Sequence, residues 1–425
     1  MKLKSVVASM LALGLASGAT LAATTNTVSR AEFDAMKDQV AKMEAVLNQH
    51  QKGSAAKQES AQTNDWANRI TISGQIDVDT FWAADDHFRY QRNSNSNSGV
   101  ELPNANIFID AVVNDWVKAH AGLHVDHNVD RDGLANVYDA LYNYDSNSWM
   151  DEAYVTVGNF AQSPFYVRAG REYVPFGMYD RNSITPSLTQ MLTQTRANAL
   201  QAGFVTANGF NGAVYAFNGT ELDKNVGKRR VNNFGANLGF ANSYNDVSYK
   251  ASVGYIYNMG DVNYIHSGLE SLTNPTGTQD HVVGGVSLDG SLQAGAFDAS
   301  AHYVTALKKF HRAEVSYIDN SGFHGAKPSA WGVDAGYSFA TAGHDSRLGV
   351  GYQRSSQANN VGPEVLWVLH YAMPKQRYVA QYDVNVAKNT DLGFQVYHDL
   401  DTKSDDGGFG NKNTTGVVRL SVKFA

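Results

Sequence analysis

The sequence predicts an all-β transmembrane barrel of about sixteen antiparallel strands, preceded by a short periplasmic α-helical coiled coil. Three observations predict it. Apolar and polar residues alternate from residue 69 to residue 425, short turns alternate with long polar stretches, and the chain opens with an export signal. Alternation of this kind suits a wall with lipid outside and water inside, in which every backbone group is paired.

The strand pattern is clearest at the two ends of this region. Alternate residues of the last segment are apolar (Val418, Leu420, Val422, Phe424), and the residues between them are polar (Arg419, Ser421, Lys423). Near residue 70 the apolar set is Ile70, Ile72, Ile76 and Val78, and the polar set is Thr71, Ser73, Gln75, Asp77 and Asp79. Successive side chains of a strand point to opposite faces, so each segment has one apolar face and one polar face.

Turn signals divide the region into hairpins. We expect short turns at Asn114-Asp115 and at 159–163, 207–210, 242–245, 290–294, 341–344 and 388–389. Longer polar stretches lie at 83–104, 127–148, 174–198, 220–231, 259–280, 306–328, 356–376 and 401–413. An even number of strands puts both ends of the barrel at the periplasmic rim. Segment 364–373 is apolar enough for a strand but would break this parity, so we assign it to a loop folded inward.

Tryptophans support a membrane wall over a soluble β-sandwich or β-propeller. They fall at or beside expected strand ends: Trp66, Trp82, Trp116, Trp149 and Trp331. Indole rings prefer the headgroup layer, where barrels carry an aromatic girdle. A soluble fold would instead bury a mixed aliphatic core.

Residues 1–22 read as a signal peptide, with Lys2 and Lys4 before an apolar run at 6–15. Cleavage is expected after Ala22, with Ala19 as the alternative. The run is shorter than the roughly 20 residues of a membrane helix. The protein is therefore expected in the bacterial outer membrane, with the lipid bilayer and lipopolysaccharide as partners.

Residues 23–64 contain an expected helix at 27–51 and a polar linker. Ser29 and Glu32 have capping-box spacing, and apolar residues form a heptad seam at Phe33, Met36, Val40, Met43 and Leu47. Two heptads are too short to be stable alone. We expect a homo-oligomer through this helix, or an amphipathic helix without a partner. Residues 65–425 would form the barrel.

Composition excludes several classes of function. The 425 residues carry a net charge of −7, which argues against nucleic acid. The absence of cysteine excludes disulfides and thiolate metal sites. The sequence holds no Gly-x-Ser-x-Gly, His-Glu-x-x-His or His-x-x-Glu-His motif, so we expect no enzyme activity and no required cofactor.

Polar residues on the wet side of the strands are candidates for the lumen and a solute path. An arginine-rich stretch around 168–196 suits carboxylates and phosphates through paired donors. It predicts an anion-attracting mouth, although such arginines also bind lipopolysaccharide phosphates or simply solvate a pore. The candidate residues are Asp77, Lys118, His120, Arg168, Glu172, Arg181 and Arg196.

Loop 127–148 has the spacing of a calcium-binding loop. Oxygen-bearing side chains occupy positions 1, 3, 5, 9 and 12, with Gly133 at position 6: Asn128, Asp130, Asp132, Asn136 and Asp139. Asn at position 1, Asp at position 12 and the lack of flanking helices depart from that motif. The alternative to a structural calcium in 128–139 is an Asp/Asn-rich surface loop.

The chain after the signal peptide resembles the LbtU family of siderophore porins over nearly its whole length, and five sequence segments carry the resemblance. They are the strand from Ile70 to Val78, the segment Gly170-Arg-Glu-Tyr-Val-Pro-Phe-Gly, Tyr303-Val-Thr-Ala-Leu, Arg377-Tyr-Val-Ala-Gln-Tyr-Asp-Val-Asn and the terminal strand. The resemblance implies uptake of an iron–siderophore complex without a TonB-coupled plug. The alternatives are a general diffusion porin for small hydrophilic solutes and a surface-loop adhesin.

Overall fold

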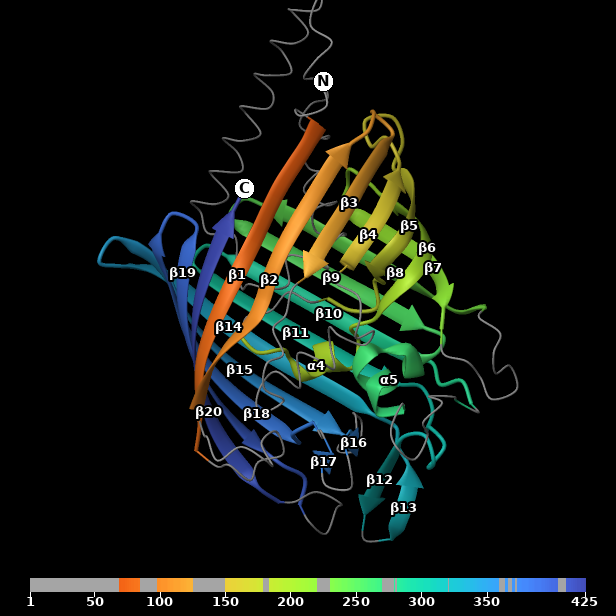
Figure 1. The fold of residues 1–425 in the computed structure, drawn as a ribbon, viewed down its shortest axis with the longest axis vertical. Coiled ribbons are helices and arrows are strands. Elements are labelled where there is room, and N and C mark those ends of the chain that lie inside the picture. The colour runs from red at the N-terminus through yellow and green to blue at the C-terminus, as the bar shows by residue number, and fades with distance from the viewer. Residues whose placement is uncertain are drawn as a thin grey trace, which may run out of the picture.

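Sixteen strands close into one antiparallel barrel, as the alternation predicts (Figure 1). The computed structural model describes residues 69–84, 98–124, 150–178, 183–219, 230–269, 279, 281–319, 321–358, 364–365, 369–370, 373–403 and 410–425. Each strand pairs with its neighbour in chain order, and the first pairs with the last. No backbone edge is left in this wall, as a bilayer requires.

The barrel strands are β1 (Ile70–Ala83), β2 (Ser98–Val112), β3 (Val117–His124), β4 (Met150–Val157), β5 (Phe165–Tyr173), β6 (Arg196–Val205), β7 (Phe210–Asn218), β8 (Val231–Tyr244), β9 (Val247–Ile256), β10 (Gly285–Ala294), β11 (Phe297–Ala306), β14 (Ser329–Thr341), β15 (His344–Ser356), β18 (Gln376–Ala387), β19 (Thr390–Leu400) and β20 (Lys412–Phe424).

Five short structural units lie in four of the connections between barrel strands. They are α4 (Leu188–Met191), η3 (Met259–Asp261), α5 (Asn263–Leu269), the hairpin β12 (Ser316–Asp319) to β13 (Gly322–Gly325), and the pair β16 (Glu364–Val365) and β17 (Leu369–His370). Strands β16 and β17 pair only with each other. The prediction that segment 364–373 stays outside the barrel wall is therefore confirmed.

The exterior of the wall is apolar and its interior is polar. In β20, Leu420, Val422 and Phe424 are exposed, whereas Arg419 and Ser421 are buried. The same alternation holds in β1, where Ile72 and Ile76 are exposed, and in the central strands. A closed barrel with this exterior indicates the bacterial outer membrane and its lipid bilayer. Among the described residues, no helix has both the length and the apolar character to cross a membrane.

The turns define one rim of the barrel. β1 begins and β20 ends at the rim where the short hairpins turn, which agrees with an even strand number (Figure 1). Two turns come later in the chain than predicted, at residues with positive φ. One lies at Asn245 (φ 52), the last residue of the predicted turn 242–245, and the other at Gly295 (φ 58), just after the predicted turn 290–294. Strands also extend into predicted loops, since β2 begins at Ser98 and β6 at Arg196.

Several predictions lie outside the described residues. These are the signal peptide at 1–22, the coiled coil and linker at 23–64, Trp66, Trp149, Arg181 and the calcium-like loop with Asn128, Asp130, Asp132, Asn136 and Asp139. The three described tryptophans that the girdle argument used, Trp82, Trp116 and Trp331, are all exposed.

The two faces of β8 provide a test of the wall. Leu238 is 52% exposed on the exterior face, and Asn237 beside it faces the lumen. Leu238→Lys should destabilise the folded barrel by about 2–4 kcal/mol, because it places a charge in lipid. Asn237→Lys, the matched control, should cost much less. Equilibrium unfolding in lipid vesicles measures both, and equal losses would contradict the assignment of the faces.

Candidate functional site

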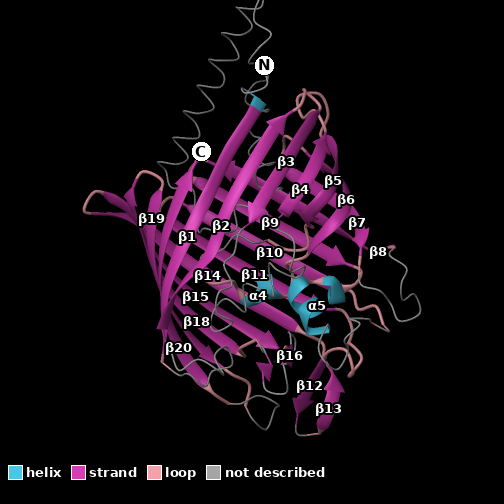
Figure 2. Cartoon of the chain, viewed as in Figure 1, coloured by secondary structure: helices cyan, strands magenta, loops and turns pink. Residues whose placement is uncertain are grey.

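The connection between β5 and β6 folds into the lumen. We call residues 183–195 the strap. Its main chain is held by wall side chains: Gln381 and Gln395 accept from the Ile184 amide at 2.9 and 2.5 Å, and Gln353 accepts from the Leu188 amide at 2.9 Å. Helix α4 and α5 lie within the ring of strands (Figure 2). The strap therefore runs inside the barrel, at the level of these glutamines.

An apolar side chain fixes the strap at the same place. Ile184 is 4% exposed and packs among inward-facing residues of four strands: Phe81, Val379, Tyr397 and Val417. The Arg377 guanidinium donates to the carbonyl of Pro186 at 3.1 Å, and Arg419 donates to that of Ile184 at 3.5 Å. Backbone and side-chain contacts thus hold this end of the strap against the wall formed by β18, β19, β20 and β1.

The other end of the strap packs with the β9–β10 connection. The Gln194 carbonyl accepts from the Asn263 amide at 2.9 Å, and the Asn263 side chain accepts from the Arg196 amide at 3.0 Å. The two connections share one apolar core with the β6–β14 wall, including Phe176, Leu188, Met191, Leu192, Phe217, Ile256, Met259, Tyr264, Ile265 and Val304. This core fills part of the barrel interior.

Stretches 174–198 and 259–280 connect barrel strands as predicted, but their described residues include apolar side chains that are buried in this core. Leu188, Met191 and Leu192 follow helical spacing, and this was the available signal for a packed helical turn. The strap is an inward-folded connection that the sequence analysis did not single out. Met373, at the end of the expected inward loop 364–373, belongs to the same core.

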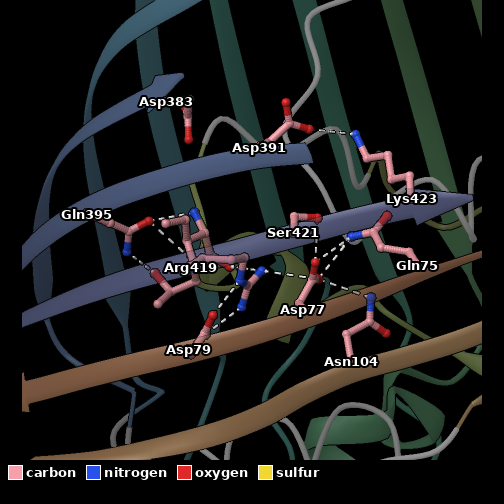
Figure 3. Close-up of polar contacts among 12 residues, drawn as sticks. Gln75, Asp77, Asp79, Asn104, Asp383, Asp391, Gln395, Arg419, Ser421 and Lys423 are labelled. Carbon is pink, nitrogen blue, oxygen red and sulfur yellow. Dashed lines mark hydrogen bonds and ion pairs between the residues drawn. The ribbon is translucent and has the colours of Figure 1, made fainter. Parts of the chain in front are cut away.

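Asp77 lies at the junction of β1, β2 and β20 and is fully buried (Figure 3). Its carboxylate accepts from Gln75 at 2.9 and 3.0 Å, from Asn104 at 3.2 Å and from Ser421 at 2.6 Å. Asp77 is one of the lumen candidates from sequence. Its carboxylate joins β1 to β2 through Asn104 and to β20 through Ser421.

Three arginines on the lumen wall form two-pronged pairs with aspartates. Arg419 binds Asp79 at 2.7 and 2.7 Å, Arg377 binds Asp399 at 2.7 and 2.8 Å, and Arg347 binds Asp298 at 2.9 and 2.6 Å. All six side chains are buried. Paired geometry of this kind neutralises both partners. The strap contains no charged residue.

Arg168 lies on the lumen side of β5, as its parity predicts. Its guanidinium binds Glu172 at 3.3 Å and donates to Thr156 at 3.1 Å. The same group lies over the rings of Tyr154 at 4.4 Å and Tyr166 at 5.8 Å, within the range of a cation–π contact. Arg168 and Glu172, both candidates from sequence, are thus brought together.

His120 connects this cluster to β2. Its Nδ1 is 2.8 Å from Asp110, its ring stacks on Tyr154 with centroids 4.9 Å apart, and its Nε2 lies 3.8 Å from Glu152. Sequence reasoning included His120 among the site candidates. Glu152 and Asp110 were not among them, although Glu152 shares the polar face of β4 with Thr156.

Arg196 begins β6 instead of lying in a loop, and its side chain is buried. It binds Asp151, which also accepts from the Tyr173 hydroxyl at 2.9 Å, and so forms an ion pair separate from that of Arg168 and Glu172. Lys118 faces the lumen opposite Thr156 and is exposed. Among the described residues, no cluster of three or more His, Asp or Glu side chains is arranged to hold a metal ion.

No known protein-family model matches the chain. The chain is 30% identical over 340 residues to a UPF0422 protein of Coxiella burnetii (strain RSA 493 / Nine Mile phase I), covering 78% of this chain and 64% of that protein. A UPF0422 protein of Legionella pneumophila (strain Paris) is 24% identical over 324 residues, covering 73% of this chain and 56% of that protein. This chain is similar to these UPF0422 proteins over about three quarters of its length. It spans less than two thirds of the length of either relative.

Solved structures match over 84% of the chain. They include an anion-selective porin from Comamonas acidovorans (TM-score 0.52, 12% identity, 99% of that chain) and the outer-membrane channel DcaP of Acinetobacter baumannii (TM-score 0.53, 13% identity, 97% of that chain). OmpF of Salmonella typhi, solved in complex with daunomycin, matches with TM-score 0.54, 12% identity and 97% coverage. The fold is a porin-like barrel. Identities this low establish the fold alone.

Arg419 provides a test of the wall pairs. Arg419→Gln leaves Asp79 buried without its cation and should lower the free energy of unfolding by about 3–5 kcal/mol. Lys423→Gln is the control, because the Lys423–Asp391 pair is partly exposed and should contribute under about 1 kcal/mol. Denaturant unfolding in micelles measures both. Asp79→Asn combined with Arg419→Gln should recover part of the loss, and no recovery would contradict the pairing.

His266 gives the loop core a pH dependence. Burial lowers the pKa of His266 from 6.5 to about 3, so the folded α5 segment keeps a neutral ring. Below pH 6.5 the unfolded segment binds a proton that the folded one resists. Stability of α5 should therefore fall as pH drops from 6.5 toward 3, by about 1.4 kcal/mol per unit. Hydrogen exchange of the α5 amides measures this, and His266→Gln should remove the pH dependence.

Proposed function

We propose that this protein is an outer-membrane channel that takes up an iron–siderophore complex without a TonB-coupled plug. The observation that carries the channel function is the strap, a connection anchored inside a closed barrel whose inner wall is polar. An inward connection narrows a lumen, and the groups that line it then act on passing solutes at close range. An enzyme has no comparable support, because no nucleophile and base are singled out.

The siderophore as solute is supported by the resemblance to the siderophore porin family, carried by the opening strand, the 170–177 segment and the terminal strand. The strap adds a structural argument. Its residues are uncharged, and the side chains of Ser183, Thr185, Gln190 and Thr193 are buried and hydrogen-bonded within the protein. The strap would therefore narrow the lumen without adding a fixed charge to the path of an iron complex. Arg168 and Glu172 would contribute to the wall opposite.

A general diffusion porin is the second candidate. The resemblance of the fold to porins supports it equally well, since a porin-like barrel needs no particular solute. Under this alternative the paired wall charges would only keep the lumen hydrated. The two functions differ in whether an iron complex is recognised.

Uptake in a deletion strain separates the two functions. We expect loss of the protein to reduce uptake of labelled ferric siderophore, with little change in permeability to small sugars and amino acids. Complementation with the full chain is the control. Normal siderophore uptake together with lost small-solute permeability would establish the general porin instead.

Purified protein gives an independent readout. Reconstituted in planar bilayers, the wild-type barrel should conduct, and ferric siderophore should interrupt the current. A protein that neither conducts nor binds siderophore would contradict both channel functions and leave the surface-loop adhesin as the remaining interpretation.

A further inference from the structure

We propose that Glu152, Glu172 and His120 form a subsite on the lumen wall for a cationic nitrogen group of the transported solute, a protonated amine or a guanidinium. The inference rests on the proposed channel function and names a chemical feature of its solute. It concerns the wall of β2 to β5, away from the paired arginines that hold the strap.

The three side chains face the lumen together. His120 and Tyr154 are directly opposite each other across β3 and β4, and Glu152 occupies the next position of the same face. Glu172 lies on the face of β5 that also carries Arg168. Exposed Val167 and Leu200 lie on the opposite, lipid-facing side. The register thus gathers two carboxylates and an imidazole on one part of the inner wall.

Three atoms of this group are buried and have no hydrogen-bond partner among the described residues: Glu152 Oε2, Glu172 Oε1 and His120 Nε2. The Glu152 side chain is only 1% exposed, and its Oε2 lies 3.8 Å from His120 Nε2, too far for a direct hydrogen bond. A buried carboxylate without a cation is costly, and buried polar atoms nearly always have partners. Each of these three atoms therefore lacks a hydrogen-bond donor in the described part of the chain.

A partner that supplies N–H donors and positive charge would satisfy all three acceptors. The two carboxylate oxygens accept only, and the imidazole nitrogen can accept when the other nitrogen holds its proton toward Asp110. The cluster already holds one guanidinium, that of Arg168 over Tyr154 at 4.4 Å, with Glu172 as its counter-ion. The wall therefore suits this chemistry, and one internal cation does not satisfy all of its acceptors.

Side-chain exposure falls steadily from Asp110 through His120 to Glu152. Asp110 has a side chain 56% exposed, His120 behind it is 10% exposed, and Glu152 lies deepest. Asp110 would attract a cation from water, and the buried carboxylate would bind it where water screens least. Under this proposal the wall beside Arg168 attracts cations, whereas the sequence predicted an anion-attracting mouth there. The Arg168 guanidinium already contacts Glu172, Thr156 and Tyr154.

Matched ligands test the subsite on the purified full chain in micelles. Methylguanidinium and N-methylurea have nearly the same shape, but only the first is charged. Titration calorimetry should show binding of methylguanidinium and at least about tenfold weaker binding of N-methylurea. Equal binding, or no binding of methylguanidinium, would overturn the proposal, and this comparison requires no variant. Tighter binding of Mn²⁺ than of methylguanidinium would also overturn it, in favour of a metal site.

A variant pair localises the effect. Glu152→Gln should weaken methylguanidinium binding about tenfold, since it removes the charge and keeps the shape. Asp391→Asn, which removes a lumen carboxylate paired with Lys423, should leave binding unchanged. Equal effects of the two substitutions would overturn the assignment to Glu152.

Bilayer recordings separate this inference from the channel function. A wild-type protein that conducts but does not distinguish the two ligands contradicts the subsite alone. A wild-type protein that distinguishes them but never conducts contradicts the channel and keeps the binding site.

Discussion

A polar group that leaves water must find a partner, and the rest of this structure depends on that requirement. In the membrane it closes the strands into a ring, because an open edge would leave amides and carbonyls in lipid. Inside the ring the same requirement acts on side chains. Arg347, Arg377 and Arg419 are buried against the wall, and each is matched by an aspartate that receives two of its hydrogen bonds.

The same principle positions the strap. The amides of Ile184 and Leu188 have left water, and glutamine side chains of the wall accept from them. The apolar side chains of the strap are buried separately. Ile184 packs among wall residues, and Leu188 and Met191 pack in the core shared with α5. A connection held by both kinds of contact has a defined position in the lumen, which selection among solutes requires.

The strands of the barrel wall could be predicted from the sequence, but the packing inside the barrel could not. The period of two between Ile70 and Phe424 gave the strand count and the two faces, because lipid and water impose them locally along each strand. Arg168 and Glu172 fell on the lumen face by the same parity. The strap depends on contacts between residues about 200 positions apart, such as Ile184 with Gln395, and no local period encodes these. The parity of β4 also puts Glu152 on the lumen face, but only the fold shows that it lies beside His120.

The junction of β1 with β20 has a consequence for assembly in the membrane. Asp79 and Arg419 are 340 residues apart, and Asp77 and Ser421 are 344 apart, yet both contacts lie at one seam. Contacts at such separation form late, because the loop entropy of nearly the whole chain opposes them. Until the final strand arrives, two carboxylates of the first strand remain hydrated, and they favour a water-facing edge over entry into lipid. Pairing of β20 with β1 would therefore close the barrel and remove water from these two carboxylates in the same step.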